Sequence, residues 1–442
     1  MEIGTNATDP PTGRGGGTPR GRLRLHLVGW SDPKVVALAL VALAAGFGQF
    51  GAVAALGDVA RSFGRIVHGT TIADQAGLSG TELGVGLAII RLASLGALPL
   101  AGVADRLGRR RVLLTTCAAG LAFTVGAALS PGYWWFVVVF ALGRPLLSAA
   151  AAISQVGAAE HTASADRAKA IALIAAGYGV GAGLTAVLHG IGQGTLGFRG
   201  VFALAVVPLA FLPLIGRWVA EPDRFALAEA HAEHPVPVLG AVERPYRARL
   251  AVVAALAFAV SIVTGPANSF LFVYAENVRG LSHPDTAGMV VLAAPVGLAG
   301  LLLGRWLADR MGRRPAGALA MVAMCAFGVV AYSGSRAALV VGYELGVFAA
   351  STFAPAGGAL ANELFPTDVR ASVAGWNVFA GVIGAVVGLL VFGAVADVGR
   401  RFGIAGAITF LPVLATTALF LLLPETKGRE PEELWPETGP GT

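Results

Sequence analysis

The chain is 442 residues long, with 55% hydrophobic residues, 13% charged residues and a mean hydropathy of +0.72. Soluble domains carry about 25% charged residues, so the composition excludes a soluble globular protein and indicates that lipid is the main solvent. The formal net charge of +6 comes without a basic-aromatic stripe, so we expect no nucleic-acid partner.

Twelve apolar runs follow one another along the chain, and a bilayer crossing needs about 20 apolar residues. They cover residues 35–60, 80–103, 112–130, 134–158, 168–190, 200–220, 249–275, 285–308, 315–334, 337–361, 371–396 and 403–423. The sequence therefore predicts an all-α polytopic membrane protein with twelve transmembrane helices. An even number of crossings places both termini on the same side of the bilayer.

The distribution of lysine and arginine predicts the orientation. If both termini are cytoplasmic, 23 of the 32 basic residues lie in inner segments and 7 in outer segments, while Arg91 and Arg144 fall inside spans. The positive-inside rule therefore favours cytoplasmic termini, and we expect a multi-pass protein of a prokaryotic plasma membrane. Residues 1–34 read as a disordered cytoplasmic tail.

Landmarks of the first half return in the second half after 203 or 204 residues. The segment ADRLGRR at 104–110 returns as ADRMGRR at 308–314, and Glu160 with Arg167 returns as Glu363 with Arg370. We therefore expect two six-helix bundles in parallel repeat, at 35–220 and 249–423, joined by a loop at 221–248 and followed by a tail at 424–442. Such duplication is typical of transporters that bind their substrate between the halves.

The duplicated loop closely resembles the G-x-x-x-D-R-x-G-R-R motif of the major facilitator superfamily. The second copy is the better match, from Gly304 through Arg314, whereas the glycine of the first copy, Gly102, lies two places late. ELFPTDVR at 363–370 and PETKG at 424–428 look like the sugar-porter and metabolite–proton symporter branches. The resemblance covers residues 35–430. It implies a monomeric secondary transporter that moves a sugar, organic acid or similar metabolite by alternating access, with the proton as coupling ion.

Departures from the motifs of known branches leave the substrate open. The chain has no Gln-Leu-Ser-type sugar-porter signature, and the segment from Glu160 to Arg167 lacks the usual proline. The fifth span has four alternating glycines, at 177–183, but not the Gly-Pro pair of drug antiporters. Proton-driven efflux of a drug or metabolite is therefore the alternative function, and a facilitator without coupling is a third.

The motif residues are expected to act as a conformational latch. In one conformation a carboxylate such as Asp105 or Asp309 would accept hydrogen bonds from nearby arginines and face a helix N-terminus, and it would lose them in the other. The alternative is that the arginines only anchor the protein to lipid headgroups. The set comprises Gly102, Asp105, Arg106, Gly108, Arg109, Arg110, Glu160, Arg167, Gly304, Asp309, Arg310, Gly312, Arg313, Arg314, Glu363 and Arg370.

Charged residues inside spans are costly and usually functional. Arg144 and Glu344 fall in the fourth and tenth spans, which line the central cavity in the family that the chain resembles. We expect them to bind substrate or carry the coupling proton, or else to form a buried structural pair or bonds to backbone carbonyls. Arg91 is expected to be either a site residue or a packing partner of a neighbouring helix. Asp58 is expected to be either a site residue or a solvated residue near the outer end of its span. The neutral candidates are Gln49, Gln155, Asn268 and Asn377, each of which could instead bond a neighbouring helix.

An enzyme is not expected, because the sequence has no nucleophile elbow, P-loop or dinucleotide-binding fingerprint. Cys117 and Cys325 are far apart in sequence, and the seven histidines are scattered without ligand spacing. The sequence therefore predicts no metal site and no cofactor. Without a P-loop we also expect no direct drive by ATP.

Overall fold

The computed structural model describes residues 32–67, 71–162, 166–192, 196–221, 239–366, 369–399 and 401–435. The tail expected at 1–34 lies outside this part except for its last three residues, as does most of the loop expected at 221–248. All regular secondary structure in the described ranges is helical.

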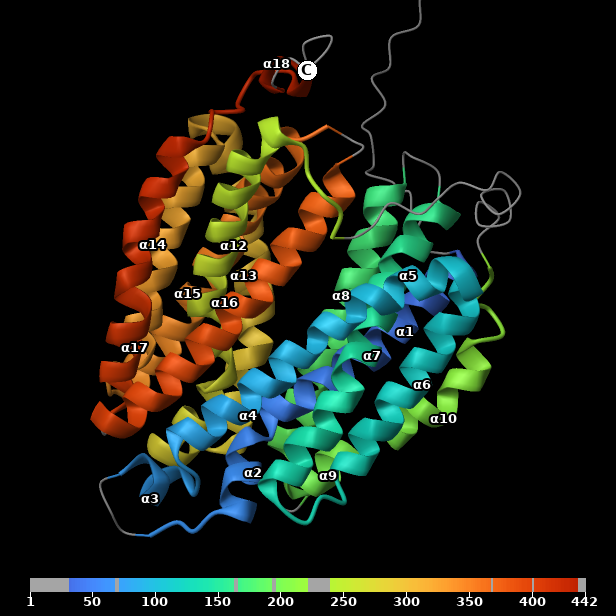
Figure 1. Cartoon of the computed structure of the whole chain (residues 1–442). Helices are drawn as coiled ribbons and strands as arrows, with labels where there is room; N and C mark the ends of the chain where they lie inside the picture. Colours follow the sequence, from blue (N-terminus) through green and yellow to red (C-terminus); the bar gives the residue numbers. More distant parts are fainter. Residues whose placement is uncertain are drawn as a thin grey trace, which may run out of the picture.

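Six crossings form the first half of the molecule (Figure 1). The second crossing is interrupted by a short 3₁₀ turn, η1 (Ser94–Gly96), and two short helices, α2 (Leu56–Phe63) and α3 (Ile72–Ala76), connect the first two crossings. The crossings are α1 (Pro33–Ala54), α4 (Gly80–Ala93) with α5 (Ala97–Leu107), α6 (Arg109–Ala127), α7 (Tyr133–His161), α8 (Arg167–Ile191), and α9 (Gly197–Ala203) with α10 (Val206–Ile215).

Six further crossings form the second half. A π-helical turn, η2 (Val273–Val278), follows the first of them, and α18 (Pro431–Leu434) lies near the end of the chain. The crossings are α12 (Arg244–Ser269), α13 (His283–Met311), α14 (Arg313–Ala331), α15 (Arg336–Glu363), α16 (Arg370–Gly399), and α17 (Phe402–Phe410) with η3 (Leu411–Leu422).

The predicted twelve-helix architecture is confirmed for the described residues. Eleven helical stretches are long and apolar enough to cross a membrane. The twelfth crossing is α6, a 19-residue helix that begins with three arginines and is therefore less apolar. The apolar run expected at 35–60 differs in detail: α1 ends at Ala54, Ala55 leaves helical geometry, and α2 continues as a separate helix.

Small residues bring equivalent helix pairs close together in the two halves. Gly181 of α8 packs against the backbone of Leu43 in α1, and Gly384 of α16 packs against the backbone of Phe258 in α12. A side chain at either glycine would overlap the neighbouring carbonyl group. Lipid supplies no hydrophobic force between helices, so such close backbone contact is a main source of their association. The abundance of glycine is thus partly a packing requirement.

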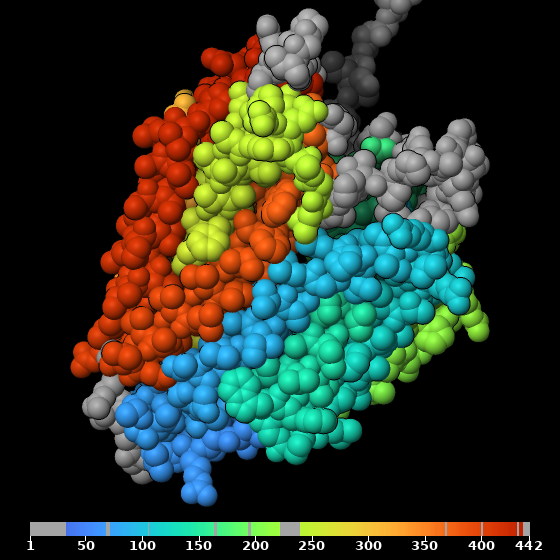
Figure 2. All heavy atoms as spheres, viewed as in Figure 1, coloured from blue at the N-terminus to red at the C-terminus, as the bar shows by residue number. Residues whose placement is uncertain are grey.

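The two halves meet at one end of the molecule and diverge toward the other (Figure 1). We call the joined end, near α2 and α3, the seam end, and we call the end with the loops at 107–109 and 311–313 the motif end. At the seam end Asp397 of α16 accepts hydrogen bonds from the backbone N–H groups of Gly80 and Thr81, at 2.7 and 2.8 Å. Figure 2 shows α16 packed directly against α4. Six hydrogen bonds join described residues of the two halves at the seam end.

Candidate functional site

A cavity of about 270 Å³ lies between the two halves. The first half contributes residues of α1, α4 and α7 to its wall, and the second half contributes residues of α12 and α16. Its polar lining consists of Gln49, Arg91, Arg144, Thr264, Asn268 and Ser269. Four of the eight residues expected to bind substrate or protons therefore converge here.

Arg144 is held at the cavity wall by α1. Its Nη1 donates a hydrogen bond of 3.2 Å to the backbone carbonyl of Gln49, and its Nε has no partner among the described residues. One turn further along α7, the hydroxyl of Ser148 donates to the side-chain oxygen of Gln49 at 3.2 Å. The guanidinium group is thus oriented but not neutralised, since a carbonyl oxygen carries no formal charge.

Arg91 lies in the last turn of α4, directly before the break at η1. Its backbone carbonyl accepts a hydrogen bond from the hydroxyl of Ser94 at 2.6 Å, which accompanies the change of helix geometry. Its Nε lacks a partner in the described part of the chain. Two guanidinium groups therefore line one cavity, and their like charges repel each other.

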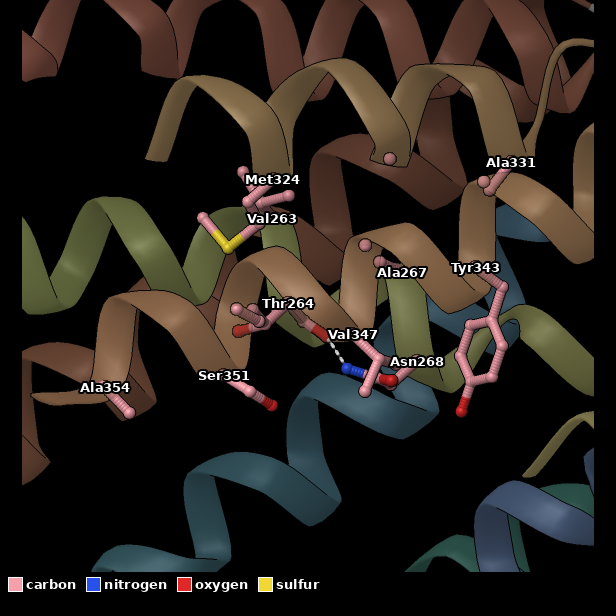
Figure 3. Close-up of a pocket in the computed structure, with 14 residues that line it drawn as sticks. Val263, Thr264, Ala267, Asn268, Met324, Ala331, Tyr343, Val347, Ser351 and Ala354 are labelled. Carbon is pink, nitrogen blue, oxygen red and sulfur yellow. Dashed lines mark hydrogen bonds between the residues drawn. The ribbon is translucent and has the colours of Figure 1, made fainter. Parts of the chain in front are cut away.

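The second half supplies an uncharged wall. Thr264 and Asn268 also line an adjoining cavity of about 320 Å³ between α12, α14 and α15. Figure 3 shows this cavity with the amide of Asn268 donating to the carbonyl of Thr264, at 2.8 Å. The remaining lining is mainly apolar, with Tyr343 and Ser351 as further hydrogen-bonding groups. Neither cavity has an aspartate or glutamate in its described lining.

Glu344 does not meet Arg144. It is buried, with 8% of its surface exposed, and neither carboxylate oxygen has a hydrogen-bond partner among the described residues. Phe348 and Thr352, one and two turns further along α15, lie with their backbones against Gly300 and Gly304 of α13. Glu344 therefore lies on the face of α15 that packs toward α13, and it lines neither cavity.

The other two neutral candidates lie outside both cavity linings. Gln155 is exposed on α7. Asn377 is partly buried on α16, and its side-chain oxygen has no partner among the described residues.

At the motif end of the first half, Glu221 binds the beginning of α6. Its carboxylate accepts hydrogen bonds from the backbone N–H groups of Arg109 and Arg110, at 2.5 and 3.1 Å. The side chain of Arg109 pairs with Glu160 on α7, and Arg167 donates to the carbonyl of Ala159. Gly108 has a φ of 93°, which a glycine adopts without strain. The side chain of Asp105 lies outside the described residues.

The second half repeats this arrangement. Glu425 accepts from the backbone N–H groups of Arg313 and Arg314 at 2.8 and 3.1 Å, and Arg313 pairs with Glu363 at 3.2 Å. Gly312 has a φ of 106°. The motif residues Arg106 and Arg310 are exposed on their helices, and Arg370 donates to the carbonyl of Phe365.

The carboxylate at the helix N-terminus is not the one expected from the motif. Asp309 is 62% exposed and lies 3.6 Å from Arg313 of the next helix, while Glu425 occupies the N-terminus of α14. Burial raises the pKa of Glu425, but hydrogen bonds from the N–H groups of Arg313, Arg314, Lys427 and Thr426 outweigh it and lower the pKa below its usual range. The sequence signal for Glu221 and Glu425 was only their similar position after the last crossing of each half.

Asp58 is buried, not solvated. It lies on α2 at the seam end, next to His189 of α8 and His283 of α13, with the buried Glu276 of η2 nearby. Sequence reasoning missed His283 and Glu276, because no spacing along the chain connects them with Asp58.

The comparisons with known proteins agree with this architecture. The profile described as Major Facilitator Superfamily matches residues 38–306 and 289–439. A gallate transporter of Pseudomonas putida is 27% identical over 76% of this chain and 80% of its own length. A 3-(3-hydroxy-phenyl)propionate transporter of Escherichia coli K12 is 30% identical over 74% and 81%. The crystal structure of a D-xylose-proton symporter superimposes with a TM-score of 0.69 at 19% identity, covering 90% of this chain and 99% of that one.

Proposed function

Because this chain belongs to the major facilitator superfamily, we propose that it is a secondary transporter of a small organic carboxylate, coupled to protons. The observation that carries the proposal is the pair Arg91 and Arg144 in a cavity between the halves whose described lining contains no carboxylate. The alternating-access mechanism of such a transporter would expose this cavity to each side of the membrane in turn.

Two arginines without a carboxylate in the described lining favour an anionic substrate. A cation inside a membrane span is unfavourable without a counter-charge, so a ligand that brings the opposite charge gains from both guanidinium groups. A carboxylate also matches the planar fork of an arginine, which can donate two parallel hydrogen bonds to it. The cavity is thus better suited to an anion than to an uncharged sugar.

The rest of the lining supports an aromatic acid. Phe50 and Phe140 lie in the same cavity as the arginines, and Tyr343 and Ser351 line the adjoining one. An aromatic ring would pack on the apolar groups, while ring hydroxyls would bond the polar ones. Gallate and 3-(3-hydroxyphenyl)propionate, after which two relatives are named, both combine an aromatic ring with a carboxylate and a hydroxyl.

The decisive experiment compares ligands that differ only in the carboxylate. Gallate should raise the thermal unfolding midpoint of the purified protein and bind saturably, whereas pyrogallol, which has the same ring without the carboxylate, should do neither. Replacement of Arg199, an arginine outside the cavity, by Gln serves as the control and should leave gallate binding unchanged. Equal binding of gallate and pyrogallol would contradict an anion site.

For the coupling proton we propose Glu344. Its support is the burial of a carboxylate that has no partner among the described residues of the half opposite the arginines. A carboxyl group in such a place can be protonated in one conformation and released in the other when its hydration changes. Arg144 would then act on the substrate and not directly on the proton carrier.

We also propose that the motif end faces the cytoplasm of a prokaryotic cell, on the basis of the basic residues counted there. Leu107 at the motif end is 63% exposed and Leu129 at the seam end is 79% exposed, while both native cysteines are buried. In intact cells an impermeant maleimide should label Leu129→Cys but not Leu107→Cys. The reverse pattern would invert the orientation.

A further inference from the structure

Four side chains that can bind a metal ion converge at the seam end. We call Asp58, His189, Glu276 and His283 the seam cluster. Each offers one ligand atom, and these four atoms lie within 4.8 Å of one another. They come from α2, α8, η2 and α13, so two belong to each half of the molecule.

Burial leaves these groups few alternative partners. The side chains of His189 and Glu276 are 2% and 1% exposed. Neither ring nitrogen of His189 has a hydrogen-bond partner among the described residues. Glu276 has a close polar neighbour in His283, whose Nδ1 lies 2.9 Å from Oε2. Unpartnered polar atoms as deeply buried as the ring nitrogens of His189 are rare in native proteins and point to a missing ligand.

The distances suit a small divalent cation. His189 Nε2 lies 3.5 Å from Asp58 Oδ2 and 3.9 Å from Glu276 Oε2, and His283 Nε2 lies 4.0 Å from Asp58 Oδ1. Ligand atoms about 2.0–2.2 Å from a tetrahedral zinc ion are about 3.3–3.6 Å apart. The two distances from Asp58 involve its two different oxygens, so small rotations of this carboxylate and of the imidazoles would be needed to bring one atom of each residue to these separations.

We propose that the seam cluster binds one divalent transition-metal ion of the zinc class, which joins the two halves at this end. Two imidazole nitrogens and two carboxylate oxygens suit zinc, whereas calcium and magnesium prefer sites built from oxygen alone. Two carboxylates neutralise the ion when the histidines bind as neutral rings, while Arg61 beside Asp58 adds one positive charge.

The location makes the site specific for one conformation. Separating the halves at the seam end would pull Asp58 and His189 away from Glu276 and His283. A ligand that binds one conformation more tightly shifts the equilibrium toward it. Bound zinc is therefore expected to stabilise the conformation described here and to oppose opening at this end.

Arg61 offers a variant that tests the site without removing a ligand. Its Nη1 lies 3.9 Å from Asp58 Oδ1, and its Nη2 donates to the side chain of Asn277. The guanidinium charge repels a cation held by Asp58. Arg61→Gln should therefore bind zinc several-fold more tightly, while an amide at this position can still donate to Asn277.

The experiment uses the purified full-length protein after treatment with a chelator. Zinc affinity is measured by competition with a chromophoric chelator, and the thermal unfolding midpoint is recorded with and without zinc. We expect one saturable site, a higher midpoint with zinc, and no such effect of magnesium or calcium. Glu276→Gln and His283→Gln should each weaken binding more than about 10-fold. The matched control is His161→Gln, a histidine substitution at the motif end that should change nothing.

Three results would overturn the proposal: no saturable zinc binding by the wild-type protein, unchanged affinity in both ligand variants, or weaker binding by Arg61→Gln. If a ligand variant does not give a monodisperse protein, the zinc affinities of Arg61→Gln and of the wild-type protein still test the proposal. None of these measurements requires a transport substrate, so the result is independent of the carboxylate proposal.

Discussion

The two halves of this transporter are similar at the motif end and different in the middle. At the repeat separation of 203 residues, Arg144 corresponds to Val347 and Ser148 corresponds to Ser351. Arg144 lines the cavity between the halves, and Val347 and Ser351 line the adjoining one. The repeat position shared by Arg144 and Val347 therefore faces a central cavity in both halves. The first half places a cation there and the second an apolar group. Duplication has thus kept the scaffold while the cavity walls took different chemistry.

At the motif end the two halves have kept the same interactions. Each half has a glutamate that accepts from two backbone N–H groups at the start of its third crossing, and an arginine that pairs with a glutamate on its fourth. The position that matches Gly304 in the first half is Leu100. The difference at this motif position concerns helix packing, because Gly304 lies against the backbone of Thr352. The packing of the two motif copies can therefore be compared by substitution.

The largest effect is expected at Glu344, whose counterpart in the first half is Ala141. In proteoliposomes, Glu344→Gln should retain substrate counterflow but lose accumulation driven by a pH gradient, because an amide cannot carry the proton. Accumulation that persists in the variant would exclude Glu344 as proton carrier and make the buried Asp58 the next residue to test.

Arg144 and Val347 should differ in their effect on substrate affinity. Arg144→Gln removes charge-assisted hydrogen bonds worth about 1.5–3 kcal/mol and should weaken gallate binding about 10- to 100-fold. Val347→Ala removes only apolar contact and should weaken it about 10-fold or less. Titration calorimetry on both variants gives the two affinities. Equal losses would mean that the halves share recognition and that the asymmetry of the cavity is unimportant.

Gly304 and Gly102 should respond differently to a methyl group. A Cβ at residue 304 would overlap the carbonyl oxygen of Thr352, whereas nothing lies within 4 Å of a Cβ at residue 102. Gly304→Ala should lower the free energy of unfolding by about 1–3 kcal/mol. Gly102→Ala should change it by less than about 0.5 kcal/mol. Unfolding in mixed detergent compares the two, and a destabilised Gly102→Ala would show that both copies pack alike.

The smallest effect is expected at Glu425, and it depends on pH. Since folding lowers the pKa of this carboxyl group, its stabilisation is present above the ordinary value of 4.5 and is lost as pH falls through the lower folded value. At neutral pH, Glu425→Gln should lower the free energy of unfolding by about 0.5–1 kcal/mol. The difference between wild type and variant should shrink below about pH 4.5, and a constant difference would remove ionisation as its cause.

Hydropathy, charge and the repeat were enough to predict the architecture, because each crossing is encoded by a continuous stretch of sequence. They were also enough to single out Arg91, Arg144, Gln49 and Asn268, which line the cavity between the halves, since polar residues are rare in apolar helices. They did not show which neighbouring helix each face of a helix packs against. Glu344 shares an apolar span with cavity residues but lies on the face toward α13.

Contacts between distant segments escaped prediction for a related reason. His189, Glu276 and His283 are scattered along the chain, and only the meeting of α8, η2 and α13 brings them to Asp58. Glu425 likewise replaces Asp309 at the start of α14 because the chain returns there after its last crossing. Neither arrangement leaves a pattern of spacing in the sequence.

The hydrogen bonds of Asp397 have a consequence for the speed of the transport cycle. This residue of the second half caps a helix of the first, binding the N–H groups of Gly80 and Thr81 and the hydroxyl of Thr81. If the halves separate here during transport, as the proposed mechanism requires, α4 would have to exchange this cap for water first. We therefore expect the cap to slow each turnover, and a shorter or neutral side chain at 397 would remove it without changing the proposed substrate site, the proposed proton carrier or the motif.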